Sequence, residues 1–333
     1  PSPITAIIYF RNRLMMTLAR ATVSPVSRFN IRMIFSVARM SASSGLMNFC
    51  VCVKFINSHE HIDSSGFQMK KHGEPEKRNL LLYLLVAFVW SWTFWLSLVV
   101  FSKSPLEDPY ALLLFGIGGF GPFAAAVSVT RFAEGKNGLK MLLKKGINYR
   151  FRRIWLVPIF LFFPAVYGII FLFGVLTGFT LDLVWLSNPL ILVPPFLLLF
   201  VVNGTAEEFG WRGYALEKLQ NSYSAVVSSL ILGFIWWLWH IPLFFVGYYG
   251  ETPVWLFLIQ MVVYAILFTW IYNNTNGSVF ATMIFHAMAN LTVAYIFPVS
   301  QFGLSLPIFF GLILTPLLTS FIVVIWGPRT LAR

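Results

Sequence analysis

Charged residues are scarce in this chain. Only 11% of its 333 residues are Asp, Glu, Lys or Arg, whereas 58% are hydrophobic and the mean hydropathy is +0.77. Soluble domains carry about 25% charged residues, so this composition excludes a soluble domain. The 35 Phe and 12 Trp residues are typical of lipid-facing and interfacial positions. We therefore expect a protein that crosses the bilayer several times.

Cysteine is almost absent, with only Cys50 and Cys52. Two cysteines a residue apart imply no disulfide framework. With His59 and His61 they could be considered zinc ligands, but their spacing matches no established zinc pattern. We expect no metal site in this segment.

Acidic residues are also few: 12 against 24 Lys and Arg, a formal net charge of +12. In a membrane protein such an excess reports topology, and we expect no nucleic-acid partner. After Met69 the basic residues gather in alternate loops. The other loops carry Glu107, Asp108, Asp182 and Glu251, with Lys103 as their one basic residue. The positive-inside rule places both termini in the cytoplasm, and the expected location is a prokaryotic plasma membrane.

Residues 1–68 differ from the remainder. They are rich in Arg and Ser and contain no uncharged run long enough to span a bilayer. Met69 precedes a basic stretch and a strongly apolar segment, as at the amino terminus of a membrane protein. We expect residues 1–68 to be a disordered or non-native extension and 69–333 to form the functional domain. An arginine-rich targeting peptide is the alternative.

Eight apolar segments of spanning length, roughly twenty residues each, follow from Leu80. They are approximately 80–101, 111–132, 154–179, 189–210, 224–246, 254–272, 278–297 and 306–326. The predicted fold class is an all-α polytopic membrane protein, a bundle of about eight transmembrane helices. The glycine-rich stretch 116–122 lies inside the second segment. It lacks the strand and soluble helix of a nucleotide loop, which favours close helix packing through small residues.

Two adjacent carboxylates, Glu207 and Glu208, follow the apolar run of the fourth segment. Ionisable groups in a membrane are costly and usually mark function. On a helix Glu208 and Arg212 share one face, and Glu207 is turned about 100° away. This arrangement suggests that Arg212 holds Glu208 and that Glu207 is free for chemistry. Alternatively, a helix end simply extends these charges to the headgroups.

The only histidines after residue 72 lie in later segments. His240 follows Trp236 by four residues, and Pro242 is expected to kink or end that helix. His286 and Asn290 are four apart in the seventh segment and point the same way. Structural hydrogen bonding between helices is the alternative for both motifs.

Together these groups predict one polar cavity, because each would be costly against lipid. A carboxylate, two imidazoles and an amide can activate water and stabilise an oxyanion. Glu207, His240 and His286 could also hold one divalent metal such as zinc. Intramembrane hydrolysis, proton-coupled transport and a catalytically silent scaffold all remain open at this point.

The depth of the motifs raises a geometric problem. His240 lies roughly 20–25 Å along its helix from the predicted cytoplasmic end, whereas Glu207 and His286 are shallower. They meet only if the fourth helix is sunk deeper or if 217–224 is a submerged start of the fifth. We expect the cavity to open toward the cytoplasmic half.

The three motifs resemble those of a known family. Glu207-Glu-x-x-x-Arg212, Trp236-x-x-x-His240 and His286-x-x-x-Asn290 are similar to the motifs of the CPBP family of intramembrane proteases. That family includes the type II CAAX prenyl endopeptidases and the bacteriocin-processing or immunity proteins, also called the Abi family. The motif core spans residues 189–297. One departure is Trp236, where the family often has Phe.

The resemblance implies a role for each matching residue. Glu207 would activate the hydrolytic water beside His240, and His286 with Asn290 would hold the oxyanion. Glu208 and Arg212 would fix the active-site helix, with Glu208 also adding to the polar shell and Trp236 as support. A zinc ion on Glu207, His240 and His286 is the metal-dependent version. The implied partner is a peptide or lipidated protein in the bilayer.

Overall fold

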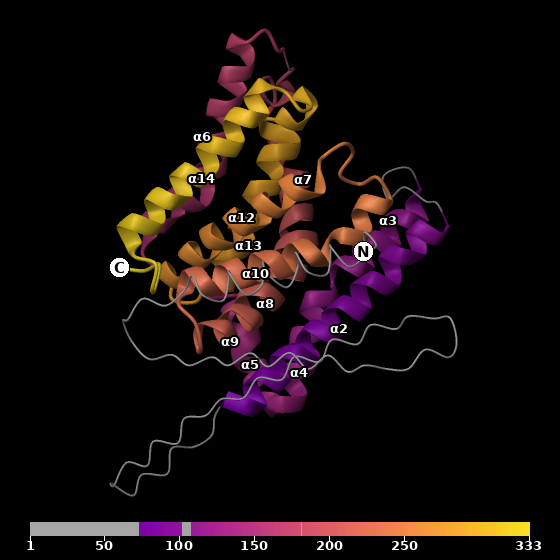
Figure 1. Ribbon diagram of the computed structural model, residues 1–333, viewed down its shortest axis with the longest axis vertical. Coiled ribbons are helices and arrows are strands. Elements are labelled where there is room, and N and C mark those ends of the chain that lie inside the picture. The colour runs from indigo at the N-terminus through magenta and orange to yellow at the C-terminus, as the bar shows by residue number, and fades with distance from the viewer. Residues whose placement is uncertain (1–72, 102–107, 181) are drawn as a thin grey trace, which may run out of the picture. The chain divides into compact units, whose positions relative to one another are not determined.

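A computed structural model describes residues 73–101, 108–180 and 182–333 (Figure 1). All of these residues lie in the compact unit Lys71–Arg333. The expected extension 1–68 lies outside the described residues. The described part is built from helices, with no strand within it.

Eight described helices are long and apolar enough to cross a membrane. They are Glu76–Val100, Pro109–Ala133, Arg153–Leu176, Pro189–Gln220, Ala225–Phe245, Val254–Asn274, Val279–Ile296 and Leu306–Trp326. The predicted all-α polytopic bundle is confirmed. Most boundaries fall within a few residues of the prediction, and the exception is the end of the fourth helix.

Several spans consist of shorter helical pieces, and a few short helices lie between the spans. In chain order the pieces are α2 (Gly73–Val100), α3 (Pro109–Gly119), α4 (Gly121–Ala133), α5 (Gly135–Lys145), η1 (Arg153–Trp155), α6 (Leu156–Leu176), η2 (Val184–Leu186), η3 (Pro189–Leu192), α7 (Val193–Leu199), η4 (Phe200–Thr205), α8 (Ala206–Gly210), η5 (Trp211–Leu216), α9 (Glu217–Gln220), α10 (Ala225–Trp239), α11 (Ile241–Phe245), α12 (Val254–Asn274), α13 (Val279–Leu291), η6 (Thr292–Ile296), η7 (Val299–Phe302) and α14 (Leu306–Trp326). The fourth span is the most interrupted, and it carries the two adjacent carboxylates.

Helix starts follow ordinary capping chemistry. The Ser278 hydroxyl accepts a hydrogen bond from the Ala281 amide at 3.0 Å at the start of α13. Ser224 caps α10 in the same way, and the Asp108 carboxylate accepts from the first amides of α3. These caps satisfy amides that would otherwise lack partners where each helix enters the membrane.

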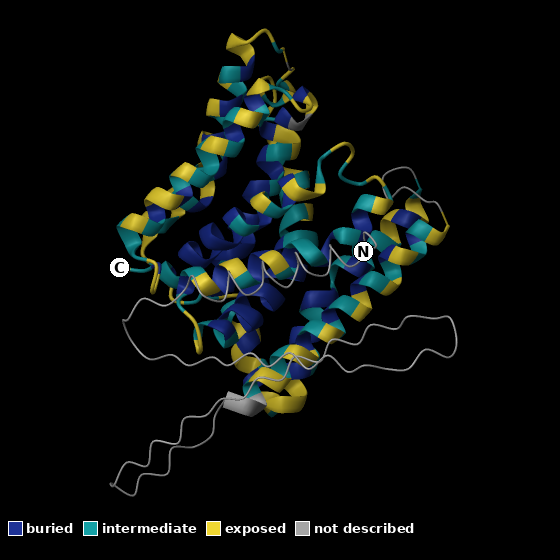
Figure 2. Ribbon diagram, in the orientation of Figure 1, coloured by how far each residue is buried: buried dark blue, intermediate teal, exposed yellow. Residues whose placement is uncertain are grey.

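The core is formed by α12 and α13 (Figure 2). In each, 67% of the most apolar stretch is buried, against 11% for α14. The helix α10 packs along α12, and α2 packs along α4. The polar motifs therefore lie on helices that other helices cover.

The glycine-rich stretch of the second span packs closely against α2, as predicted. A Cβ on Gly118 would overlap the Trp95 ring, and one on Gly121 would overlap Ser91 and meet the Ala87 carbonyl oxygen at 2.7 Å. Small residues thus let the two helices approach closely.

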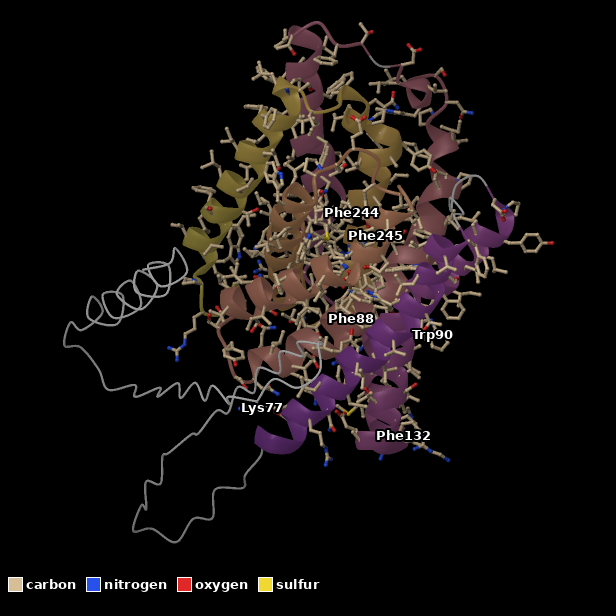
Figure 3. All side chains as sticks on the ribbon, turned by 45° about the vertical axis from the view of Figure 1, so that its right-hand side comes forward. Lys77, Phe88, Trp90, Phe132, Phe244 and Phe245 are labelled. Atoms are coloured by element: carbon tan, nitrogen blue, oxygen red, sulfur yellow. The ribbon has the colours of Figure 1, made fainter. Side chains whose placement is uncertain are left out.

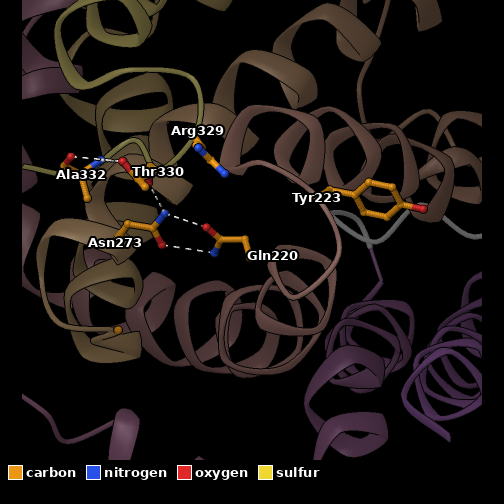
Figure 4. Close-up of a pocket in the computed structure, with 7 residues that line it drawn as sticks. Gln220, Tyr223, Asn273, Arg329, Thr330 and Ala332 are labelled. Atoms are coloured by element: carbon orange, nitrogen blue, oxygen red, sulfur yellow. Dashed lines mark hydrogen bonds between the residues drawn. The ribbon is translucent and has the colours of Figure 1, made fainter. Parts of the chain in front are cut away.

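Hydrogen bonds gather the basic loops at one end of the bundle, which we call the basic end. It comprises residues 134–153, 217–224, 273–278 and 327–333. The Lys218 ammonium donates to Glu134 at 3.0 Å, and Lys145 pairs with Glu217. Gln220 and Asn273 exchange amide hydrogen bonds in a polar pocket that Thr330 also lines (Figure 4).

The remaining described loops, 177–188, 246–253 and 297–305, form the other end, which we call the acidic end. The Trp185 indole donates to the Ile296 carbonyl at 2.9 Å, and Phe179 packs on Phe302 with ring centroids 4.7 Å apart. In Figure 3 Lys77 and Phe132 lie toward the basic end, away from Phe244 of α11. The chain thus alternates between the two ends, as eight spans require.

Candidate functional site

The backbone of the motif helix is irregular at the carboxylates. Wider π-turns, η4 and η5, flank the short α8 segment that holds Glu207 and Glu208, and a third, η6, begins two residues after Asn290. Such turns are rare in proteins overall, but those that occur are often found at functional sites. Gly204 lets η4 approach α13, since a Cβ there would meet the Met283 carbonyl oxygen at 2.8 Å.

Glu207 is held by two neutral donors. Its Oε2 accepts a hydrogen bond from the Trp236 indole N–H at 2.7 Å, and its side chain is also hydrogen-bonded to Asn203. The residue is only 4% exposed. Sequence reasoning missed Asn203, although its position one turn before Glu207 places it on the same helix face.

Glu208 is fully buried and bridges two helices. Its Oε1 accepts from Arg212 Nη1 at 2.8 Å, and His286 Nδ1 lies 2.8 Å from the same oxygen. The Arg212 guanidinium lies over the rings of Trp236 (4.4 Å) and Phe268 (4.2 Å). The predicted pairing of Glu208 with Arg212 is confirmed. Glu208 therefore orients His286 on α13.

His240 lies at the junction of α10 and α11, where Pro242 was expected to break the helix, and the break is confirmed. Its Nδ1 is 2.7 Å from the Trp236 carbonyl oxygen. A carbonyl can only accept, so Nδ1 is assigned the hydrogen and Nε2 of the neutral ring is an acceptor. The Trp239 and Phe257 rings pack around the imidazole at 4.6 and 5.3 Å.

These groups converge on one cavity of about 740 Å³. Its lining includes Glu207, Trp236, His240, His286, Asn290 and Asn203. Glu208 and Arg212 do not line it and lie behind the wall, which supports the predicted division between a held and a free carboxylate. The Trp236 ring centroid is 5.6 Å from that of His286 and 6.0 Å from that of His240.

The depth problem disappears because the fourth helix was predicted too short. It runs to Gln220, and the segment Trp211–Leu216 is buried throughout. At 1.5 Å per residue, Glu207 lies about 20 Å from Gln220, and His240 lies about 22 Å from Ala225. The predicted end at residue 210 is wrong because Glu208 neutralises Arg212, so this charge does not end the span. Residues 217–220 are its last turn, and α10 begins only at Ala225, so 217–224 is not a submerged start of the fifth span.

The cavity lies in the half of the bundle nearer the acidic end. Its walls include Tyr248–Thr252 and Gly303. The expected opening toward the cytoplasmic half stays a prediction. Burial raises the pKa of the Tyr248 and Tyr249 phenols, which keeps both hydroxyls protonated as hydrogen-bond donors.

The residues do not form a metal site in this arrangement. Within the described ranges no group of three or more His, Cys, Asp and Glu side chains could hold a metal ion. Glu207, His240 and His286 therefore do not meet that requirement in this arrangement. The predicted zinc site stays a prediction.

Comparison with known proteins shows which family the chain that forms this cavity belongs to. Residues 189–292, which include all three motifs, match the type II CAAX prenyl endopeptidase Rce1-like family. The chain belongs to this family of intramembrane proteases. It is similar to CAAX prenyl protease 2 of Methanococcus maripaludis, with 30% identity over 229 residues, 65% of this chain and 84% of the relative. The membership favours a hydrolase over a transporter or a scaffold.

Proposed function

We propose that this chain is an intramembrane endopeptidase in which Glu207 and His240 activate the water that hydrolyses the peptide bond. The observation that carries the proposal is the convergence of Glu207, His240, His286 and Asn290 on one cavity inside a membrane bundle. Inside an apolar bundle the dielectric response is low, so fixed dipoles and charges act strongly on a reacting group.

The reaction uses groups already in place. Water attacks the carbonyl carbon and forms the new C–O bond while its proton passes to the Glu207 carboxylate. His240 Nε2, an acceptor in the assigned tautomer, accepts a hydrogen bond from the same water. When the C–N bond breaks, the proton moves from Glu207 to the leaving amine, so the carboxylate is restored.

The oxyanion role belongs to Asn290 and His286. The Asn290 amide donates a hydrogen bond to the developing negative charge. His286 supplies a second donor from Nε2 when its ring carries a hydrogen on both nitrogens, and its Nδ1 is then held by Glu208, which also accepts from Arg212. Glu208 is thus a positioning residue rather than a group that touches substrate.

The proposed substrate is a peptide or a lipidated protein that enters the cavity from the bilayer. The motif residues lie among apolar walls that include Leu199, Ile308 and Leu312, which suit an apolar segment or chain. The relative is named a CAAX prenyl protease, so a prenylated peptide is one candidate class. Bacteriocin-type peptides are the other.

The test is hydrolysis by the purified full chain in detergent. A prenylated peptide, the same peptide without the prenyl group and a cell-derived peptide library are incubated with and without chelator. Glu207→Gln should lose turnover yet keep its thermal unfolding profile, whereas Glu134→Gln, a surface carboxylate paired with Lys218, should keep full activity. Full turnover in Glu207→Gln would sink the proposal. Loss of activity with chelator, restored by zinc, would establish metal dependence.

A further inference from the structure

A second polar cluster lines the cavity and takes no part in the proposed hydrolysis. The Tyr167 hydroxyl on α6 lies 2.9 Å from the Tyr264 hydroxyl on α12, and Tyr264 is also hydrogen-bonded to the side chain of Gln260. All three residues line the cavity. They form a chain of hydrogen-bonded groups that joins two helices and ends at a primary amide.

The face of α12 that carries this cluster runs past both histidines of the site. The Phe257 ring packs against His240 with centroids 5.3 Å apart, and the Phe268 ring packs against His286 at 5.3 Å. Gln260 follows Phe257 by three residues, and its tyrosine partner precedes Phe268 by four, so all of them share one helix face. At 1.5 Å per residue, Gln260 lies only about 4.5 Å along the axis from Phe257. Its amide therefore lies beside the reaction centre.

The cluster is more than a bridge between helices. Joining α6 to α12 needs only the bond between the two hydroxyls. Gln260 adds an amide that has both donor and acceptor groups, and its hydrogen bond to Tyr264 occupies only part of that capacity. Tyr264 is buried, whereas Gln260 is half-buried at the cavity wall. A buried tyrosine thus fixes a side chain that can still bind a group inside the cavity.

A peptide inside the bundle brings groups that need such a partner. Its backbone N–H and C=O groups leave water, and each one without a hydrogen bond is costly in an apolar surrounding. The proposed catalytic residues serve only the scissile bond. No Lys or Arg is among the described residues that line the cavity, which favours a neutral polar group over an anion. A backbone amide matches the Gln260 amide, since each presents a donor and an acceptor.

We infer that Gln260 binds the substrate backbone at an amide that flanks the scissile bond, and that Tyr264 and Tyr167 are positioning residues that hold its side chain. The inference rests on the proposed function, because it takes the cavity to bind a peptide for cleavage. Main-chain hydrogen bonds of this kind give affinity that does not depend on the side chains of the peptide.

Binding of a prenylated peptide to the full-length Glu207→Gln chain, in which turnover should be lost, tests this contact apart from the chemistry. Adding Gln260→Leu, which removes the amide, should weaken binding about threefold to tenfold, as for one neutral hydrogen bond. Adding Tyr264→Phe as well should cause no further loss, because this hydroxyl acts through the amide. Thr269→Val is the control, since it removes a 2.7 Å hydrogen bond between α12 and Ser229 outside the cavity and should leave binding unchanged. Unchanged binding in Gln260→Leu would overturn the inference.

A change in the peptide separates a direct contact from a structural effect. One backbone amide at a time, away from the scissile bond, is replaced by an ester, which removes the N–H donor and weakens the carbonyl acceptor. At one flanking position the ester should lower affinity for the chain that has Gln260 and have no such effect on Gln260→Leu. Equal effects on both chains at every position would overturn the inference.

Failure of this contact and failure of the proposed mechanism give different results. Full turnover in Glu207→Gln would sink the mechanism, whereas an ester effect that depends on Gln260 would still stand. If the parent chain hydrolyses the peptide and Gln260→Leu binds it equally well, only the contact with Gln260 fails. A chain that binds neither the prenylated peptide nor its unmodified form would also overturn the inference.

Discussion

Trp236 connects four of the residues around the site. Its indole donates to Glu207, its carbonyl oxygen lies against His240, and its ring contacts Arg212 and His286. One aromatic residue therefore fixes both the carboxylate and the imidazole proposed to activate water. The roles of the ring and of the N–H can be separated by substitution.

We predict that Trp236→Phe keeps the fold and lowers kcat about tenfold to a hundredfold. The ring remains, but Glu207 loses a hydrogen bond to a charged acceptor, a contribution of about 1.5–3 kcal/mol. Steady-state kinetics on the cleaved peptide measures the effect. Trp237→Phe removes an indole bond to the Val254 carbonyl outside the cavity and should leave kcat unchanged. Equal losses in both variants would contradict the assigned role.

Arg212→Ala should act through stability. It leaves the fully buried Glu208 without its guanidinium partner, and breaking a buried pair in this way costs about 3–5 kcal/mol. Lys218→Ala breaks a surface pair with Glu134 and should cost less than about 1 kcal/mol. Unfolding of both purified variants in detergent gives the comparison. If Arg212→Ala unfolds like the parent, then Glu208 is not held as described.

Asn290→Ala should slow hydrolysis without unfolding the bundle. Loss of one oxyanion donor costs on the order of 3 kcal/mol, or 10²-fold in kcat, with KM little changed. His286→Ala should abolish turnover, because it removes both the second donor and the partner of Glu208. Full activity in His286→Ala would remove the oxyanion role from the mechanism.

At the scale of elements, the packing of α2 against the second span sets one wall of the cavity. Trp95 lines the cavity and also fills the space beside Gly118. The position of α3 is thus coupled to the shape of the site. Within the same helix, Gly116 has no atom within 4 Å of an added Cβ.

We predict that Gly118→Ala destabilises the protein and lowers activity, whereas Gly116→Ala does neither. The added methyl group at Gly118 overlaps a fully buried indole, and overpacking of this kind typically costs about 1–3 kcal/mol. Thermal unfolding and peptide hydrolysis of the two variants are compared. Equal behaviour of the pair would show that the contact with Trp95 is easily relieved.

At the scale of the whole molecule, every proposed catalytic residue and the eight spans found among the described residues lie after Met69. We predict that a chain starting at Met69 inserts and hydrolyses peptide as the full chain does. Membrane extraction and the peptide assay on both chains measure this. Failure of the shorter chain to insert would show that residues 1–68 are needed.

The number of spans, their approximate limits and the three motifs followed from the sequence alone. The reason is that bilayer thickness fixes the length of an apolar run, and a cluster of ionisable groups is conspicuous in such runs. The pairing of Glu208 with Arg212 was equally local, since helix geometry determines which residues share a face. The same local signals showed the close packing of the second span.

Only the tertiary structure decided how these parts act together. The fourth helix continues past Arg212 because Glu208 cancels its charge, and Glu208 reaches His286, which is 78 residues away in the chain. Asn203 was recognised as part of the site only from its hydrogen bond to Glu207. The tautomer of His240 was assigned from the hydrogen bond between its Nδ1 and the Trp236 carbonyl oxygen. Which half of the bundle holds the cavity depends on how side chains from helices distant in sequence pack together, and no single segment encodes that packing.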